Sequence, residues 1–133
     1  DSFTQWKTLF DELAEKSAKK GVKVIIFNSI PTFPESITGQ SKQWFNSLSK
    51  RNAGVGRKRL INNYRTVNET LNAVARSHSN VEVFDIFSEI CPQSNEICTP
   101  EKYIDQWHLS ASGSLSLREG LLKKLNWVNR IYR

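Results

Sequence analysis

Two short apolar runs constrain the fold of this chain most strongly, because each has the length and β-branched content of a buried strand. They are Val22–Phe27 and Val81–Phe84. A nearly continuous apolar strand is typical of a parallel sheet that is covered on both faces. A helical segment precedes each run and another follows the second. The order helix, strand, helix, strand, helix predicts an α/β fold with helices on both faces of a parallel sheet.

The flanking segments have the apolar spacing of amphipathic helices. Ser2–Lys20 opens on a serine capping box and ends before Gly21. Its predicted apolar face consists of Phe3, Trp6, Leu9, Phe10 and Leu13. A second helix is predicted over Arg57–His78, with Leu60, Tyr64, Val67, Leu71, Val74 and Ala75 on one face. The last helix is predicted to begin near Ser110 and to direct Leu117, Leu121, Leu122 and Leu125 inward.

The segments between these elements are less regular. Asn28–Gln40 contains two prolines and a glycine and is predicted to be a loop. The apolar residues of 44–48 favour a short helix, which Gly54 and Gly56 would end. A further helical turn is expected after Asp85.

Two strands are too few for the number of helices. Two parallel strands cannot cover the apolar faces of three or four helices, so either the pattern hides further strands or the sheet continues N-terminal to residue 1. The sequence contains no repeat or low-complexity segment, and we expect the second explanation. Residues 1–133 are then one domain that forms the C-terminal portion of a larger sheet.

Composition limits the classes of function. The 133 residues, 38% of them apolar, can bury about two-thirds of their unfolded surface. No apolar run of about 18 residues is present that could span a bilayer. The net charge of +6 is compatible with nucleic acid, acidic glycans or anionic lipid. We interpret the basic run at Arg57–Arg59 as solvated surface, because it opens a helix whose apolar face lies elsewhere, and we expect no nucleic-acid partner.

Cys91 and Cys98 are the only cysteines, and they flank a turn-rich segment. Their spacing matches no zinc motif, which leaves a short-loop disulfide or two buried free thiols. Asn68 begins an N-glycosylation acceptor triplet, although a glycan on that helix face would obstruct packing. The two features together favour an extracytosolic location, in which the cysteines are bonded.

The segment Tyr103–Ser110 contains the clearest chemical motif. Asp105 precedes His108 by three residues, so one turn can bring the two side chains together. The carboxylate would accept the Nδ1 proton and leave Nε2 free to act as a base towards a hydroxyl nucleophile. The alternative is that Asp105 only terminates a turn and His108 lies beside Ser110, the N-cap of the next helix.

Four other side chains need an interpretation. His78, at the end of its helix, is interpreted as structural. Asp85 ends the second strand, and we interpret it as a cap for the following turn. Trp107 either lines a pocket beside His108 or seals the turn. Ser2 would be a nucleophile only if Asp1-Ser2 were a truncated Gly-Asp-Ser block, and its capping box explains it instead.

Several of these segments together resemble one family, the SGNH-type domain that is fused to acyltransferase-three membrane proteins. A strand leads into an Ile-Pro loop, as at Ile30-Pro31, and a later strand ends in aspartate before a Cys-Pro segment and a second cysteine. The most specific block is Tyr-x-Asp-x-x-His-Leu-Ser with a glycine soon after, matched by Tyr103, Asp105, His108, Leu109, Ser110 and Gly113. The resemblance covers nearly the whole chain and concerns the C-terminal half of the domain.

The resemblance implies a three-layer α/β/α flavodoxin-like fold, incomplete at its N-terminal side, and a serine, histidine and aspartate mechanism acting on O-linked acyl groups. His108 would be the general base and Asp105 its orienting carboxylate. The Gly-Asp-Ser and oxyanion-hole blocks do not occur in the 133 residues, so the serine nucleophile would lie outside them and the isolated chain would be inactive.

The resemblance implies no metal or organic cofactor. It implies an acyl donor delivered by the membrane domain of the parent protein, on the extracytosolic side, to a hydroxyl of a glycan, lipid or other acceptor. The acyl group, the acceptor and the choice between transfer and hydrolysis stay open. The alternative function is a non-catalytic binding or interaction module with the same fold.

Overall fold

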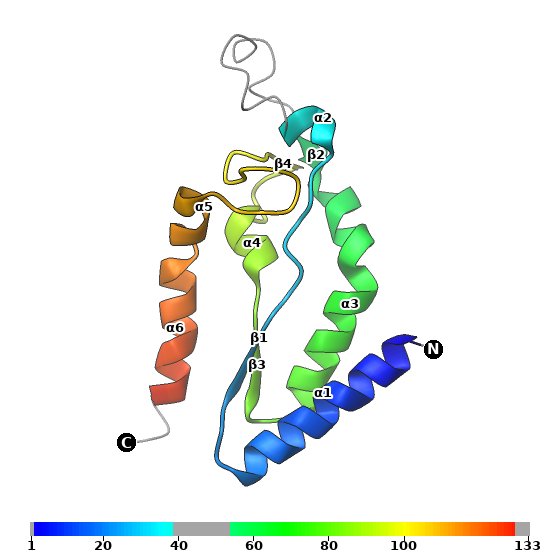
Figure 1. Cartoon of the computed structure of the whole chain (residues 1–133), viewed down its shortest axis with the longest axis vertical. Coiled ribbons are helices and arrows are strands. Elements are labelled where there is room, and N and C mark those ends of the chain that lie inside the picture. Colours follow the sequence, from blue (N-terminus) through cyan, green and yellow to red (C-terminus); the bar gives the residue numbers. More distant parts are fainter. Residues whose placement is uncertain (1, 39–53, 130–133) are drawn as a thin grey trace. The chain divides into compact units, whose positions relative to one another are not determined.

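The computed structural model describes residues 2–38 and 54–129. Its elements, labelled in Figure 1, are α1 (Ser2–Lys19), β1 (Val24–Phe27), α2 (Glu35–Thr38), β2 (Val55–Gly56), α3 (Arg57–Ser77), β3 (Val81–Phe84), α4 (Ile86–Ile90), β4 (Ile97–Cys98), α5 (Ala111–Leu115) and α6 (Arg118–Asn129). The predicted α/β alternation is present. The helix expected around residues 44–48 lies outside the described residues. None of the described helices is long and apolar enough to cross a membrane.

The chain forms two compact units, each assembled from separate stretches of sequence. The first contains Asp1–Ser29, Tyr64–Asp85 and Gly120–Arg133. The second contains Ile30–Asn63 and Ile86–Glu119. The candidate site lies entirely in the second unit.

The first unit is organised by the pairing of β1 with β3. The two strands are parallel, with Val24 opposite Val81 and Phe27 opposite Phe84. The parallel pair predicted from the two apolar runs is therefore confirmed. A hydrophobic core on one face of this sheet joins α1 and α3 to it and consists of Ala14, Val74 and Val81, with Phe10, Val24, Ile26 and Ala75 packed against them.

The opposite face of the same sheet carries a contact to α6. Side chains alternate along a strand, so Glu82 faces away from the core that holds Val81. The Glu82 carboxylate lies 2.8 Å from Lys124 Nζ of α6. Within this unit, helices therefore contact both faces of the two-stranded sheet.

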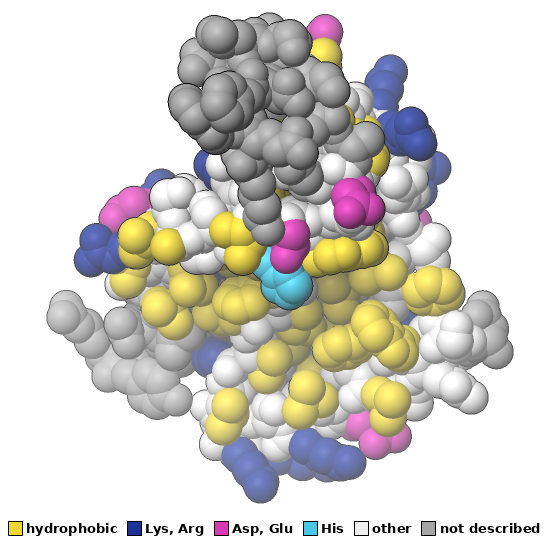
Figure 2. Space-filling model, turned by 45° about the horizontal axis from the view of Figure 1, so that its top comes forward, with side chains coloured by type: hydrophobic (Ala, Val, Ile, Leu, Met, Phe, Trp, Pro, Cys, Tyr) yellow, Lys and Arg dark blue, Asp and Glu magenta, His cyan; other side chains and the backbone are white. Residues whose placement is uncertain are grey.

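Much of the predicted apolar surface of the first unit is exposed. On α1, the exposed fractions are 40% for Phe3, 48% for Trp6, 62% for Leu9 and 48% for Leu13. The expectation that Leu122 and Leu125 point inward is wrong, because they are 40% and 42% exposed. Phe27 of β1 is also 52% exposed. Figure 2 shows hydrophobic side chains spread over the face that it draws. The described residues thus present apolar side chains that they do not cover.

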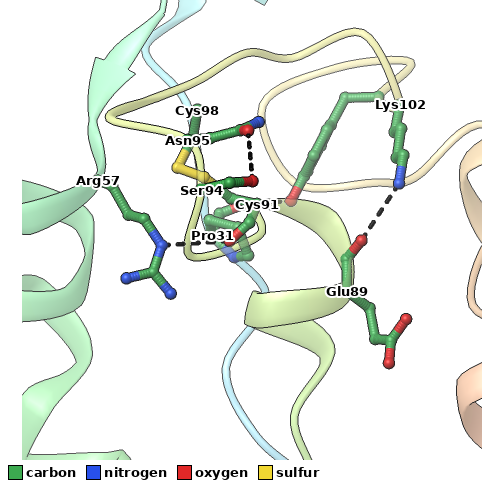
Figure 3. The surroundings of a disulfide bond; sticks show 9 residues. Pro31, Arg57, Glu89, Cys91, Ser94, Asn95, Cys98 and Lys102 are labelled. Atoms are coloured by element: carbon green, nitrogen blue, oxygen red, sulfur yellow. Dashed lines mark hydrogen bonds between the residues drawn. A yellow bond between two sulfur atoms is a disulfide. The ribbon is translucent and has the colours of Figure 1, made fainter.

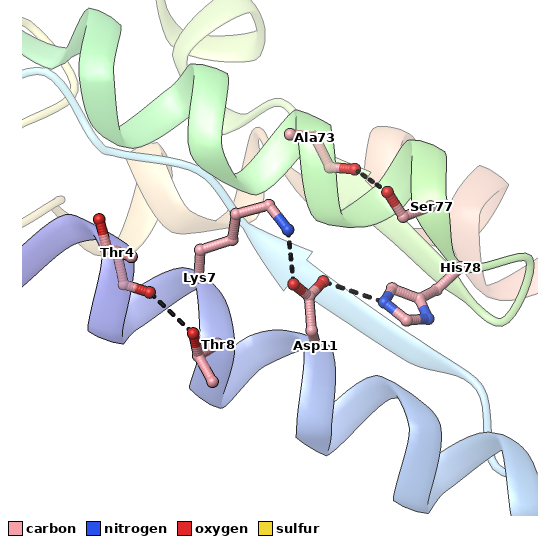
Figure 4. Close-up of polar contacts among 7 residues, drawn as sticks. All are labelled: Thr4, Lys7, Thr8, Asp11, Ala73, Ser77 and His78. Atoms are coloured by element: carbon pink, nitrogen blue, oxygen red, sulfur yellow. Dashed lines mark hydrogen bonds and ion pairs between the residues drawn. The ribbon is translucent and has the colours of Figure 1, made fainter.

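A polar contact joins the middle of α1 to the residue that follows α3 (Figure 4). His78 Nε2 lies 3.0 Å from Asp11 Oδ1, and Lys7 donates to the other oxygen of the same carboxylate. The hydrogen bond from Lys7, with a smaller contribution from His78, outweighs burial and lowers the pKa of Asp11. His78 is thus half-buried and paired, which agrees with its interpretation as a structural residue.

The second unit contains a pairing that the sequence pattern did not predict. Strands β2 and β4 are antiparallel, with Val55 opposite Cys98. Position 54, just before β2, needs a glycine, because a Cβ there would lie 2.5 Å from the carbonyl oxygen of Cys98. The segment predicted to be a loop also contains one short helix, α2. The single helix predicted after Ser110 is in fact two, because α5 ends at Leu115 and α6 begins at Arg118.

Candidate active site

A short backbone loop presents the candidate residues. Tyr103 and Leu109 form an isolated antiparallel bridge. Next to it, the Ile104 amide donates to the His108 carbonyl at 2.9 Å, and the Ser110 amide donates to the Lys102 carbonyl at 2.8 Å. Residues 104–108 therefore form a closed turn, and we name them the dyad loop.

Asp105 and His108 are brought together inside the dyad loop. His108 Nδ1 lies 2.8 Å from Asp105 Oδ2 and 3.1 Å from Oδ1. Oδ1 also accepts the backbone N–H groups of Trp107 and His108, each at 2.8 Å. The carboxylate therefore terminates the turn and holds the imidazole with the same oxygens. The two interpretations offered by the sequence describe compatible properties of one side chain.

These contacts determine the charge of Asp105. The Trp107 N–H, followed by the His108 side chain and the His108 N–H, lowers the pKa of Asp105 from 3.8 to about 2. An ionised carboxylate can only accept hydrogen bonds, so Nδ1 of His108 carries the proton that it accepts. In neutral His108 the remaining lone pair is then on Nε2, which can take a proton from a hydroxyl group.

The dyad is open to solvent. The side chains of His108 and Asp105 are 71% and 41% exposed. Among the side chains that the structure describes, none is hydrogen-bonded to Nε2 of His108. Trp107 is 61% exposed, so its ring does not seal the turn. A substrate or another part of a protein can therefore reach Nε2.

The residues that follow His108 have a structural task. Ser110 is the N-cap of α5, and its Oγ accepts the Gly113 N–H at 3.0 Å. A Cβ at Gly113 would lie 2.1 Å from the Lys102 carbonyl oxygen. Only glycine lets α5 approach the base of the dyad loop this closely. Ser110 is thus engaged as a helix cap.

The predicted disulfide is present in the second unit (Figure 3). Cys91 and Cys98 are bonded, with their Cα atoms 5.4 Å apart, and both side chains are fully buried. Arg57 donates from Nε to the Cys91 carbonyl at 3.2 Å, and its guanidinium lies over the Phe87 ring. The disulfide therefore joins the end of α4 to β4, and Arg57, at the start of α3, is hydrogen-bonded to the same point.

The other candidates lie in the first unit. Ser2 is exposed at the start of α1. Asp85 accepts a hydrogen bond from Asn28 Nδ2 at 2.6 Å. Asn68 is half-buried, and its Oδ1 accepts the Ser29 N–H at 3.3 Å. None of the three belongs to the same compact unit as the dyad.

The comparison with protein families shows to which family the chain belongs. A family model described as the SGNH domain fused to AT3 domains matches residues 2–123. The chain therefore belongs to this SGNH domain family, which confirms the resemblance noted from its motifs. The family indicates an esterase- or acyltransferase-type function and a membrane acyltransferase partner domain. No curated protein and no solved structure matches the chain significantly.

Proposed function

We propose that this chain supplies the general base of an SGNH-type O-acyltransferase or esterase domain. His108 is the base and Asp105 orients it. The observation that carries the proposal is the 2.8 Å contact between Asp105 Oδ2 and His108 Nδ1, combined with the exposure of the imidazole. This is the arrangement of base and orienting carboxylate that acyl transfer by a serine requires.

The chemistry follows from the proton positions. A serine hydroxyl attacks the acyl carbonyl carbon while its proton passes to His108 Nε2, and Asp105 stabilises the resulting imidazolium. The imidazolium then gives that proton to the leaving alkoxide as the ester bond breaks. An acceptor hydroxyl, or water in the case of hydrolysis, repeats the sequence and releases the serine.

The nucleophile, in this proposal, comes from a part of the polypeptide outside these 133 residues. No described serine is hydrogen-bonded to His108, and Ser110 is already engaged as a helix cap. Further strands would also explain the first unit, where apolar side chains of α1 and β1 are exposed and the sheet has two strands. A three-layer flavodoxin-like domain, completed at its N-terminal side, would cover these side chains.

The proposed partners follow from the family. An acyl group would arrive from the membrane domain, on the extracytosolic side, and would pass to a hydroxyl-bearing acceptor such as a glycan or lipid. The disulfide between Cys91 and Cys98 supports this location, because such bonds persist in oxidising compartments. The competing proposal is a non-catalytic binding module, which retains the fold and uses no base.

Acyl release from an activated ester tests whether the base lies in this chain and the nucleophile outside it. The isolated chain should show no turnover above background, because it has the base without the nucleophile. The complete domain should be active. Turnover by the isolated chain that disappears in Ser2→Ala would identify Ser2 as the nucleophile. Turnover that persists in Ser2→Ala and is lost in His108→Ala would identify another serine within the chain.

A further inference from the structure

We propose that Tyr103 is a positioning residue that holds the Asp105–His108 pair in its geometry by fixing the dyad loop to residues 31–33. Its catalytic consequence rests on the proposed function. Its structural consequence does not, because the loop geometry can be measured without any substrate.

Tyr103 stands at the point where the dyad loop leaves the protein interior. Its side chain is 5% exposed, whereas the next residue, Ile104, is 51% exposed. Its backbone is paired with Leu109 on the other arm of the loop. The two ends of the dyad loop therefore meet at the backbone of the buried Tyr103.

Two contacts connect Tyr103 to the segment after β1. Its hydroxyl donates to the carbonyl of Pro31, whose side chain is fully buried. Its ring meets the Phe33 ring edge to face, with the centroids 5.0 Å apart. Phe33 is itself 3% exposed. The tyrosine is thus held by a hydrogen bond and by packing at the same time.

The same segment also binds the tip of the dyad loop. The Phe33 N–H donates to the Gln106 carbonyl at 3.3 Å. Gln106 lies between Asp105 and Trp107, whose N–H is bound by the Asp105 carboxylate. Residues 31–33 therefore hold the loop at its base through Tyr103 and at its tip through Gln106. Loss of the base contact should let the three donors move away from the Asp105 carboxylate.

Tyr103→Phe isolates the hydroxyl, because the ring and its contact with Phe33 remain. In this variant the pKa of Asp105, followed by carboxyl NMR, should rise from about 2 towards 3.8. Tyr64→Phe, which removes a hydroxyl from α3 outside the dyad loop, should leave that pKa unchanged. A residue that only stabilised the fold would lower the melting temperature without changing the titration of Asp105.

A folded Tyr103→Phe protein in which Asp105 still titrates near 2 would overturn the proposal. If the variant does not fold, amide hydrogen exchange in the unaltered chain tests the proposal instead. The N–H groups of Phe33 and Ile104 should be protected, and exchange of both at unfolded rates would contradict the proposal. In the complete domain, Tyr103→Phe should lower kcat by roughly tenfold with little change in KM. Full turnover in His108→Ala would refute the proposed function and leave the NMR result for Tyr103 standing.

Discussion

The Asp105 carboxylate binds both the backbone and the ring of His108, through Oδ1 to the amide and through Oδ2 to Nδ1. One side chain therefore determines both the path of the turn and the orientation of the imidazole. A change in its charge should alter the two together.

The first prediction concerns pH. Because folding lowers the pKa of Asp105 from 3.8 to about 2, its contribution to the dyad loop is fully present above pH 3.8 and is lost as the pH falls through about 2. The amide signals of Trp107 and His108 should shift together with a midpoint near 2 in an NMR titration. A midpoint near 3.8 would show that the carboxylate is not bound by these donors.

The second prediction concerns the disulfide. Cys91 and Cys98 are separated by 7 positions in the sequence. A bond across so short a loop should contribute about 2 kcal/mol to the free energy of unfolding. The double variant Cys91→Ala, Cys98→Ala should lose this amount in chemical denaturation and should still fold. The unaltered chain under reducing conditions is the control and should lose a similar amount. Equal stability with and without the bond would contradict the prediction.

The third prediction concerns Gly113. A methyl group at this position would displace the Lys102 carbonyl, which accepts the Ser110 N–H at the base of the dyad loop. Gly113→Ala should therefore lower the free energy of unfolding by about 2 kcal/mol. Gly56→Ala is the matched control, because a Cβ at Gly56 has no atom within 4 Å. Equal effects of the two substitutions would show that α5 does not need the close approach.

The fourth prediction concerns the pairing of α1 with the end of α3. Asp11→Asn weakens the contacts with Lys7 and His78, which are partly buried, and should cost about 1 kcal/mol in the free energy of unfolding. Glu12→Gln removes an ion pair with Lys16 that is mostly exposed, and should cost less than about 0.5 kcal/mol. A larger loss in Glu12→Gln than in Asp11→Asn would contradict the prediction, because it would show that the exposed ion pair contributes more than the partly buried contacts.

The sequence predicted the elements that have a long period or a continuous apolar run. The spacing in α1 and α3 located two helices, and the apolar runs located the parallel strands β1 and β3. It missed β2 and β4, because strands of two residues have no period to detect. Apolar spacing also identifies which side of a helix is hydrophobic without showing what covers it. Leu122 and Leu125 were for that reason wrongly predicted to point inward.

The candidate site could be predicted in part. The spacing of Asp105 and His108 allowed their contact, and the family resemblance favoured it over the alternative that Asp105 only terminates a turn. Residues 31 and 33 lie some 70 positions earlier in the sequence, and only the folded chain shows that they hold Tyr103. Tyr103, at the start of the motif, was the available signal, but its burial and its partners cannot be read from the sequence.

The role of His108 as the base is tested most directly by turnover of the complete SGNH domain, measured as transfer or release of an acyl group. His108→Ala should lower kcat by about a thousandfold or more, because it removes the proton acceptor, and Asp105→Asn should cause a smaller loss. The matched control is His78→Ala, which replaces the other histidine of the chain and should keep nearly full turnover at a temperature where it is folded. Undiminished turnover in a folded His108→Ala protein would contradict the assignment of His108 as the base.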